Sequence, residues 1–184
     1  MQVLFIQGAG DGAYDADAKL AESLRTQLGA DYDVLYPAMP DEGNPRYDTW
    51  KGPIAEQIDG LEEPAVLVGH SNGASILLKY LSETTIEKRI AGLFIVAAPF
   101  WGGDGWRYDG YEEVELPSDM ANRLPKGAPV FLYQCKDDEI APFEHLALYT
   151  ALLPQATVRE VEQGGHQFND DLSVVARDIQ GLAK

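Results

Sequence analysis

The sequence predicts an α/β fold: a single-domain, three-layer α/β/α sandwich around a mainly parallel sheet of about six strands. Short apolar runs of strand length alternate with amphipathic segments of helix length, which is typical of strand–helix–strand units. Four of the six runs are nearly continuously apolar, as expected for strands buried on both faces. No repeat, low-complexity tract or linker divides the 184 residues, so we expect one domain over 1–184.

Each element follows from a local pattern. β-branched or aliphatic runs predict strands over 3–6, 34–36, 65–68, 93–97, 130–133 and 157–161. Apolar residues at helical spacing predict helices that include 20–28, 50–61, 74–81, 146–153 and 172–179. Gly29 follows the first helix as a stop signal, Pro53 is expected in a first turn, and Pro142 precedes the fourth helix. Since reactive groups collect at the carboxyl ends of parallel strands, we expect the functional residues there.

The composition limits the partners that the chain can have. Fourteen basic residues stand against thirty acidic ones, a formal charge of −16, which keeps the protein soluble and favours neutral or cationic small substrates. Such a charge repels nucleic acid and anionic membranes, so neither is an expected partner. The amino-terminal segment lacks a basic region and a long apolar run, and Cys135 is the only cysteine, so we expect a cytoplasmic location and no internal disulfide.

A G-x-S-x-G motif at Gly69-His70-Ser71-Asn72-Gly73 follows a buried strand and opens a helix. This is the context of a nucleophile elbow, in which a strained serine sits on a sharp turn. The two glycines leave room for the strand and the helix to approach each other. The motif predicts Ser71 as a nucleophile; the alternative is a small polar residue in a glycine-flanked turn.

A serine nucleophile needs a base, and the chain has three histidines. We expect His70 to be a packed elbow residue and His145 to lie on the surface of a helical segment. His166 stands in a glycine-hinged loop between the last strand and the last helix. Because this loop lies at the carboxyl end of a strand, His166 is the predicted base; the alternative is a structural histidine.

The base in turn needs an acid to orient it. Asp137, Asp138 and Glu139 all follow the strand over 130–133. Asp138, four residues before Pro142, is the predicted acid, whereas Asp137 is expected to brace the turn; the alternative is a solvated acidic loop. The order Ser71, Asp138, His166 is typical of α/β-hydrolases.

The loop Gln7-Gly8-Ala9-Gly10-Asp11-Gly12 follows the first strand and is rich in glycine. Backbone N–H groups of such a loop can hold a developing negative charge, so Ala9 and Gly10, together with Asn72, are the predicted oxyanion-hole donors. A dinucleotide-binding interpretation lacks the third glycine of that motif and the acidic residue after the next strand. The segment 98–111 carries five aromatic residues, from which Phe100 and Trp101 are predicted to line an acyl pocket; the alternative is a surface loop that covers a helix.

The segments GHSNGA, CKDDEIAP and GGHQFN, with Met39-Pro40-Asp41 and Trp50, resemble a known family. They are similar to small, lidless serine hydrolases of the α/β-hydrolase superfamily, the group around retinoblastoma-binding protein nine and the bacterial YdeN-like proteins. The resemblance implies ester hydrolysis through an acyl-enzyme. Two departures stand out: Gln7-Gly8 replaces the His-Gly of many hydrolases, and the two first strands of larger members are absent.

The predicted function is therefore hydrolysis of small neutral carboxylic esters by Ser71, His166 and Asp138. No cofactor is expected, and no metal, because the histidines lack paired ligand spacing. The alternatives are an amidase, a thioesterase or an acyltransferase with the same residues, or a catalytically silent interaction protein.

Overall fold

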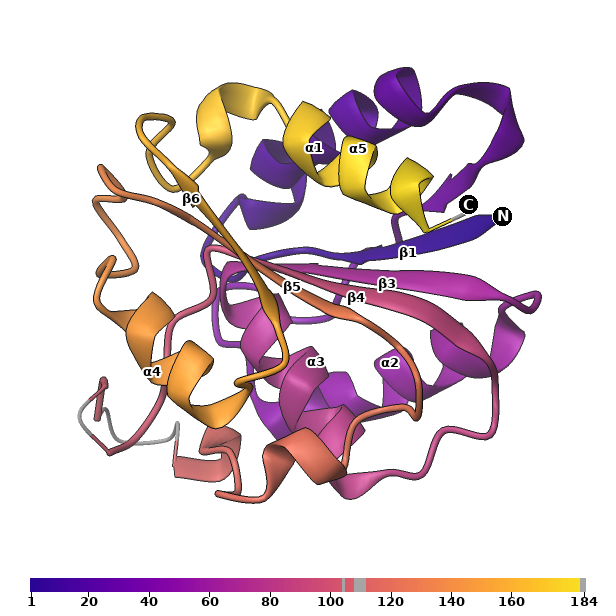
Figure 1. Cartoon of the computed structure of the whole chain (residues 1–184). Helices are drawn as coiled ribbons and strands as arrows, with labels where there is room; N and C mark the ends of the chain where they lie inside the picture. Colours follow the sequence, from indigo (N-terminus) through magenta and orange to yellow (C-terminus); the bar gives the residue numbers. More distant parts are fainter. Residues whose placement is uncertain (104, 108–111, 183–184) are drawn as a thin grey trace.

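Six parallel strands form one central sheet in the computed structural model of the chain, which describes residues 1–103, 105–107 and 112–182 (Figure 1). The strands are β1 (Gln2–Ile6), β2 (Asp33–Leu35), β3 (Ala65–His70), β4 (Ile90–Val96), β5 (Val130–Cys135) and β6 (Thr157–Val161). Their order in the sheet is β2-β1-β3-β4-β5-β6, and every neighbouring pair runs parallel. The predicted α/β sandwich is confirmed, with a sheet that is parallel across all six strands.

Helices cover both faces of the sheet, as Figure 1 shows. One face carries α1 (Ala13–Leu28) and α5 (Ser173–Gly181). The other carries α2 (Tyr47–Gly60), α3 (Ser71–Glu83) and α4 (His145–Leu152). Short 3₁₀ turns lie between these elements at Gly29–Asp31, Glu112–Val114, Met120–Asn122 and Phe168–Asp170.

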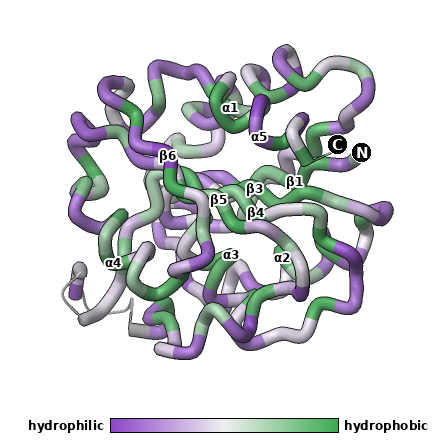
Figure 2. The backbone as a smooth tube through the Cα atoms, viewed as in Figure 1, coloured by the Kyte–Doolittle hydropathy of each residue, from purple (hydrophilic) through white to green (hydrophobic). Residues whose placement is uncertain are grey.

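The continuous apolar runs are explained by two cores, one on each face of the sheet. In β1, Val3 and Phe5 pack into the core under α1 and α5, whereas Leu4 and Ile6 pack into the core over α2 and α3. Because side chains alternate between the faces of a strand, a strand covered on both sides needs apolar residues at every position. The hydrophobic colour along the central strands in Figure 2 follows from this.

The strand order opens a crevice at the carboxyl edge of the sheet. After β1 the chain turns into α1 on one face, and after the neighbouring β3 it turns into α3 on the other face. The two loops therefore diverge at a switch point, which is where open α/β sheets bind their ligands. This geometry brings the loop after Ile6 close to Ser71, the first residue of α3.

The helix α2 starts earlier than the sequence predicts. Pro53 lies in its interior and not in its first turn, so that expectation is wrong. Trp50, Ile54 and Ile58 on the buried side of α2 are at most 1% exposed. Their burial offsets the backbone hydrogen bond that a proline removes from a helix interior.

Part of the aromatic segment 98–111 lies outside the described residues, which include neither Tyr108 nor Tyr111. Within the described ranges, no helix combines the length and apolar character that crossing a bilayer requires.

Candidate active site

Ser71 occupies a strained turn between β3 and α3. Its φ of 52° lies in the left-handed region, which a non-glycine residue rarely adopts. A Cβ at Gly69 would lie 2.6 Å from the Ala74 Cα, and one at Gly73 would lie 1.9 Å from the Gln7 carbonyl oxygen. The motif glycines are therefore required by sterics, since strand, helix and the neighbouring loop meet at these two positions.

The structure brings Ser71, His166 and Asp138 together from three strand ends. The Ser71 Oγ lies 2.8 Å from the His166 Nε2, and the His166 Nδ1 lies 2.9 Å from the Asp138 Oδ2. His166 comes from the loop after β6 and Asp138 from the loop after β5. All three side chains are buried, and that of Asp138 is 0% exposed. The result is one continuous hydrogen-bonded chain from acid to imidazole to hydroxyl.

The surroundings of Asp138 keep its carboxyl ionised. Burial raises its pKa, but the hydrogen bond and charge of His166 and the backbone N–H groups of Ile140 and Ala141 outweigh burial, so the pKa of Asp138 lies below its ordinary value. The Gln134 Nε2 also donates to the Asp138 Oδ2 at 2.7 Å. Since a carboxylate only accepts, the His166 Nδ1 carries a proton, and a neutral ring then presents Nε2 as the acceptor of the Ser71 hydroxyl proton.

The acids on either side of Asp138 hold the histidine loop. The Asp137 Oδ1 accepts hydrogen bonds from the N–H groups of Gly164 and Gly165, both at 2.9 Å. These bonds hold the pKa of Asp137 below its ordinary value. The Glu139 Oε2 accepts a hydrogen bond from the His166 N–H at 3.1 Å. Three consecutive carboxylates thus fix one loop, and the one in contact with the His166 ring is Asp138.

The same loop covers the single cysteine. A Cβ at Gly164 would lie 3.0 Å from the Cys135 Sγ, so the loop backbone packs directly on the sulfur. Burial, together with the negative charges of the three acids after β5, raises the pKa of the Cys135 thiol to about 12. Cys135 is therefore a neutral, enclosed thiol beneath the histidine loop.

The glycine-rich loop after β1 leaves one of its two predicted oxyanion donors as a candidate. The Gly10 N–H donates to the Glu42 carbonyl at 2.8 Å, so the prediction for Gly10 is corrected. In the described part of the chain, the Ala9 N–H has no hydrogen-bond acceptor. Asn72 is the second residue of α3, where a helix has not yet begun its internal hydrogen bonds. Ala9 and Asn72 therefore remain as candidate donors.

Gln7, which replaces the usual histidine, ties the neighbouring loop in place. Its side chain is fully buried; its Oε1 accepts the Met39 N–H at 2.9 Å, and its Nε2 donates to the Glu42 Oε2 at 2.8 Å. The Trp50 indole N–H donates to the Pro40 carbonyl at 2.7 Å. The Met39-Pro40 and Trp50 pattern thus has a structural cause. The hydrogen bonds from Gln7 and Trp50 hold the segment from Met39 to Glu42 in place beside the loop after β1.

A pocket of about 200 Å³ opens beside Ser71. It is lined by Ala9, Gly10, Gly43, Pro45, Ser71, Asn72, Pro99, Trp101, Trp106, Ile140 and Ala141. None of these described lining residues carries a charged side chain. Trp101 lies in the wall as predicted, with its indole N–H donating to the Asn72 Oδ1 at 3.0 Å.

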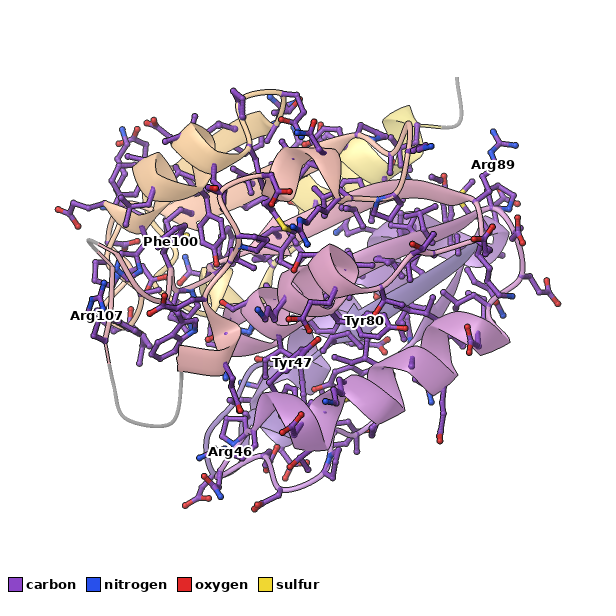
Figure 3. The ribbon with its side chains drawn as sticks, turned by 90° about the horizontal axis from the view of Figure 1, so that it is seen from below. Arg46, Tyr47, Tyr80, Arg89, Phe100 and Arg107 are labelled. Carbon is purple, nitrogen blue, oxygen red and sulfur yellow. The ribbon has the colours of Figure 1, made fainter. Side chains whose placement is uncertain are left out.

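Phe100 is not among the lining residues, so its predicted place in the pocket wall is wrong. Its ring packs edge-on against the Tyr149 ring, with centroids 5.0 Å apart, and Figure 3 shows Phe100 at the same end of the molecule as Arg107. Consecutive residues of an extended segment point to opposite sides, so only one of this aromatic pair can face the pocket.

His145 is buried, and its predicted surface position is wrong. It is the first residue of α4 and is 4% exposed. Its Nδ1 accepts the Phe100 N–H at 3.0 Å, and its ring packs edge-on against Trp106. Burial lowers the pKa of His145, which favours the neutral ring that a hydrogen-bond acceptor requires. The aromatic segment after β4 covers this end of α4, a contact that helix periodicity does not predict.

Comparison with known proteins identifies the family of the chain. Residues 22–172 match the model of the family described as Serine hydrolase. The chain belongs to the serine hydrolase family. The putative hydrolase YdeN of Bacillus subtilis is 24% identical over 149 residues, covering 78% of this chain and 73% of YdeN.

Solved structures share the fold of this hydrolase. The ydeN gene product of B. subtilis has a TM-score of 0.77 at 21% identity, covering 99% of this chain and 98% of that one. Est1E from Butyrivibrio proteoclasticus, solved with ferulic acid bound, has a TM-score of 0.70 at 13% identity, covering 99% of this chain and 87% of that one. A YdeN-like hydrolase from Pectobacterium atrosepticum has a TM-score of 0.67 at 15% identity, covering 99% and 90%. The chain thus has the α/β-hydrolase fold and is similar to YdeN-like hydrolases.

Sequence analysis of this hydrolase did not identify Asp17. This aspartate on α1 is 1% exposed, and its Oδ2 lies 2.8 Å from the His70 Nδ1. A signal was present, because Asp17 precedes Leu20, Ala21 and Leu24 at helical spacing and so continues their buried stripe by one turn. A charged residue at a core position of a helix needs a partner, and that partner is His70, which is packed in the elbow as predicted.

Neither a metal cluster nor a second, larger hollow adds to this site: the first is absent among the described residues, and the second lies elsewhere. Among the described side chains, no group of three or more His, Cys, Asp or Glu is placed to hold a metal ion. A hollow of about 750 Å³ is lined by residues 82–89 and 122–126. It lies before β4 and β5, at the amino ends of the strands, and the Ser71–His166–Asp138 chain lies at the opposite edge.

Proposed function

We propose that this serine hydrolase cleaves small, uncharged carboxylic esters through an acyl-enzyme formed on Ser71. The observation that carries the proposal is the 2.8 Å contact between the Ser71 Oγ and the His166 Nε2, within a chain that ends at a buried, ionised Asp138. A serine hydroxyl becomes an effective nucleophile only when a base removes its proton, and this contact supplies the base.

In the proposed reaction, the Ser71 Oγ attacks the ester carbonyl carbon while its proton passes to the His166 Nε2. Asp138 stabilises the resulting imidazolium. The backbone N–H groups of Ala9 and Asn72 hold the oxyanion of the tetrahedral intermediate. When this intermediate collapses, the ester C–O bond breaks and the leaving alcohol takes the proton from His166. Water, activated by the same nitrogen, then releases the acid and restores Ser71.

The pocket supports the proposed substrate class. Its volume of about 200 Å³ suits a small acyl group, and its lining, among the residues that the structure describes, offers no charged partner to a carboxylate or an ammonium group. The net charge of −16 further disfavours anionic substrates. An esterase domain from Rhodothermus marinus, which is among the structural neighbours, supports ester chemistry by analogy of fold.

A fluorophosphonate probe and a panel of p-nitrophenyl esters, thioesters and amides test this function. We expect the wild type to be labelled and to hydrolyse the short neutral esters fastest. Ser71→Ala should lose labelling, and its kcat should fall by about 10⁵–10⁶-fold. Ser82→Ala is the matched control, since it removes another buried serine at the far end of the same helix.

Two aspartate variants refine the test. Asp138→Asn should lower kcat by about 10⁴-fold, because the amide no longer holds the required tautomer of His166. Asp137→Asn should have a much smaller effect, since its side chain holds only backbone N–H groups. A wild type that neither labels nor hydrolyses any member of the panel would contradict the proposal and favour a catalytically silent binding protein.

A further inference from the structure

A second acid–imidazole pair lies directly behind the first. Asp17 and His70 are each 1% exposed, and neither lines the pocket beside Ser71. The His70 Nδ1 lies 2.8 Å from the Asp17 Oδ2, and the His70 Nε2 lies 3.0 Å from the backbone carbonyl oxygen of His166. The rings of His70 and His166 are 4.9 Å apart at their centroids. A buried side chain next to the nucleophile thus contacts the backbone of the proposed base.

Both partners of His70 are acceptors, which fixes its protonation. The Asp17 Oδ2 already accepts the Gly8 N–H at 2.7 Å, and its Oδ1 accepts a hydrogen bond from the Gln167 Nε2 at 3.1 Å, so the carboxyl is ionised. A carbonyl oxygen cannot donate. The His70 ring can therefore make both of its hydrogen bonds only when both nitrogens carry protons, as an imidazolium.

The electrostatics agree with this geometry. Burial lowers the pKa of His70, but the charge and hydrogen bond of Asp17 outweigh burial, so the pKa of His70 lies above its ordinary value. Burial raises the pKa of Asp17, but the charge and hydrogen bond of His70 outweigh burial, so the pKa of Asp17 lies below its ordinary value. The groups that face His70 are Asp17 from α1, the His166 ring and carbonyl from the loop after β6, and the more distant charge of Asp138 from the loop after β5.

One carboxylate therefore joins three loops of the site. Asp17 holds Gly8 in the loop after β1, His70 in the elbow and Gln167 next to the proposed base. Displacing any of these loops would break a hydrogen bond to a buried charge, which costs more than losing a neutral one.

We propose that Asp17 and His70 form a positioning pair, in which the buried imidazolium of His70 holds the His166 backbone so that Nε2 faces the Ser71 hydroxyl. This inference rests on the proposed function, because it assigns His166 as the base. The pair touches neither substrate nor reacting atoms and acts through His166.

The variants Asp17→Asn, His70→Asn and the double variant test the pair. Each single change should lower kcat for p-nitrophenyl acetate by about ten- to a hundredfold, since misplacement of a base by about 1 Å costs that much. KM should change by less than about threefold, because the pocket is intact. The double variant should lose no more than the more damaging single variant, because the two side chains act as one unit.

Asp178→Asn is the control for a lost, partly buried carboxylate contact. Asp178 lies on α5, outside the Ser71–His166–Asp138 chain, and accepts hydrogen bonds from Tyr133 and Arg159, so this variant should lower the unfolding midpoint and leave kcat unchanged. The pH profile separates positioning from general destabilisation. Because the imidazolium form is lost as pH rises through the raised pKa of His70, wild-type kcat/KM should decline on the basic side, and His70→Asn should lack that decline.

The protonation state of His70 can be measured without any activity. The chain has three histidines, so ¹⁵N-histidine labelling gives three ring systems, assigned with the variants His145→Gln and His166→Asn. We expect both ring nitrogens of His70 to carry protons at neutral pH. A single neutral tautomer at His70 overturns the proposal, and so does kcat in His70→Asn within about twofold of wild type. A wild type that is inactive on every ester refutes the proposed function instead, while the NMR measurement still decides whether the imidazolium bridge exists.

Discussion

At the scale of single residues, Trp101 contacts two parts of the site. Its ring lines the pocket, and its indole N–H donates to the Asn72 side chain. Trp101→Ala should therefore raise KM for a hexanoate ester more than for an acetate ester, by about tenfold or more, since burial of each methylene is worth about 0.8 kcal/mol. Steady-state kinetics on a p-nitrophenyl series from acetate to hexanoate measure the difference.

Trp101→Phe is the matched variant, because it keeps an aromatic wall and removes the hydrogen bond to Asn72. Its effect should be similar for every chain length and should fall mainly on kcat. If Trp101→Ala changed the acetate and hexanoate esters equally, Trp101 would not be the wall of an acyl pocket.

Sequence reasoning at this scale succeeded where a residue has a fixed place along the chain. Ser71, Asp138 and His166 each follow a strand, and the structure places their side chains within hydrogen-bonding distance. It failed where a contact between residues distant in the sequence determines the role of a residue. The Gly10 N–H was unavailable because Glu42, on a distant segment, accepts it. The role of Asp17 depended on a histidine 53 residues away along the chain.

At the scale of elements, the elbow depends on the absence of a side chain at Gly73. Gly73→Ala would place a Cβ 1.9 Å from the Gln7 carbonyl oxygen, so β1 and α3 would have to separate. We expect a loss of about 2–3 kcal/mol in the free energy of unfolding, or failure to fold. Denaturant titration measures this loss.

Gly52→Ala is the control on the exposed side of a helix. Gly52 lies inside α2, and a Cβ there meets nothing within 4 Å. This variant should be neutral or more stable by up to about 1 kcal/mol, because alanine favours the helix. Equal destabilisation by Gly73→Ala and Gly52→Ala would show that the close approach of Gly73 to the Gln7 carbonyl is not the cause of the lost stability.

The elements themselves were predictable because their patterns are local. All six strands and all five helices appear where periodicity places them. The ends of the strands and helices were less predictable. The helix α2 begins at Tyr47, whose N–H donates to the Glu113 side chain at 2.9 Å. That cap comes from a segment 66 residues away in the chain and leaves no trace in the local sequence.

At the scale of the whole molecule, two kinds of titratable group limit the pH range in which the fold is most stable: carboxyls whose pKa is lowered and an imidazole whose pKa is raised. The pKa values of Asp17, Asp138 and Asp178 are lowered in the fold, so their contribution is complete above their ordinary value of 3.8 and is lost as pH falls through the folded values. The pKa of His70 is raised, so its contribution is complete below 6.5 and is lost as pH rises through its folded value. We expect maximal stability between about pH 5 and pH 6.5.

Denaturant unfolding across this pH range tests the expectation. His70→Asn should flatten the basic side and leave the acidic side in place. Added salt separates these local pairs from the general repulsion of a chain with a charge of −16, because it screens exposed charges over about 10 Å at 0.1 M but acts weakly on buried ones. A profile without any decline above pH 6.5 would contradict a buried imidazolium at His70.

Cys135 gives this molecule a built-in reporter. The sulfur is sealed by the backbone at Gly164, two residues before His166, and its thiol holds its proton across the ordinary pH range. A thiol reagent can react only after that backbone has lifted away and admitted solvent. The rate at which a reagent modifies Cys135 therefore measures how often the loop that carries His166 opens. No added probe site or engineered mutation is needed, because the chain has a single cysteine.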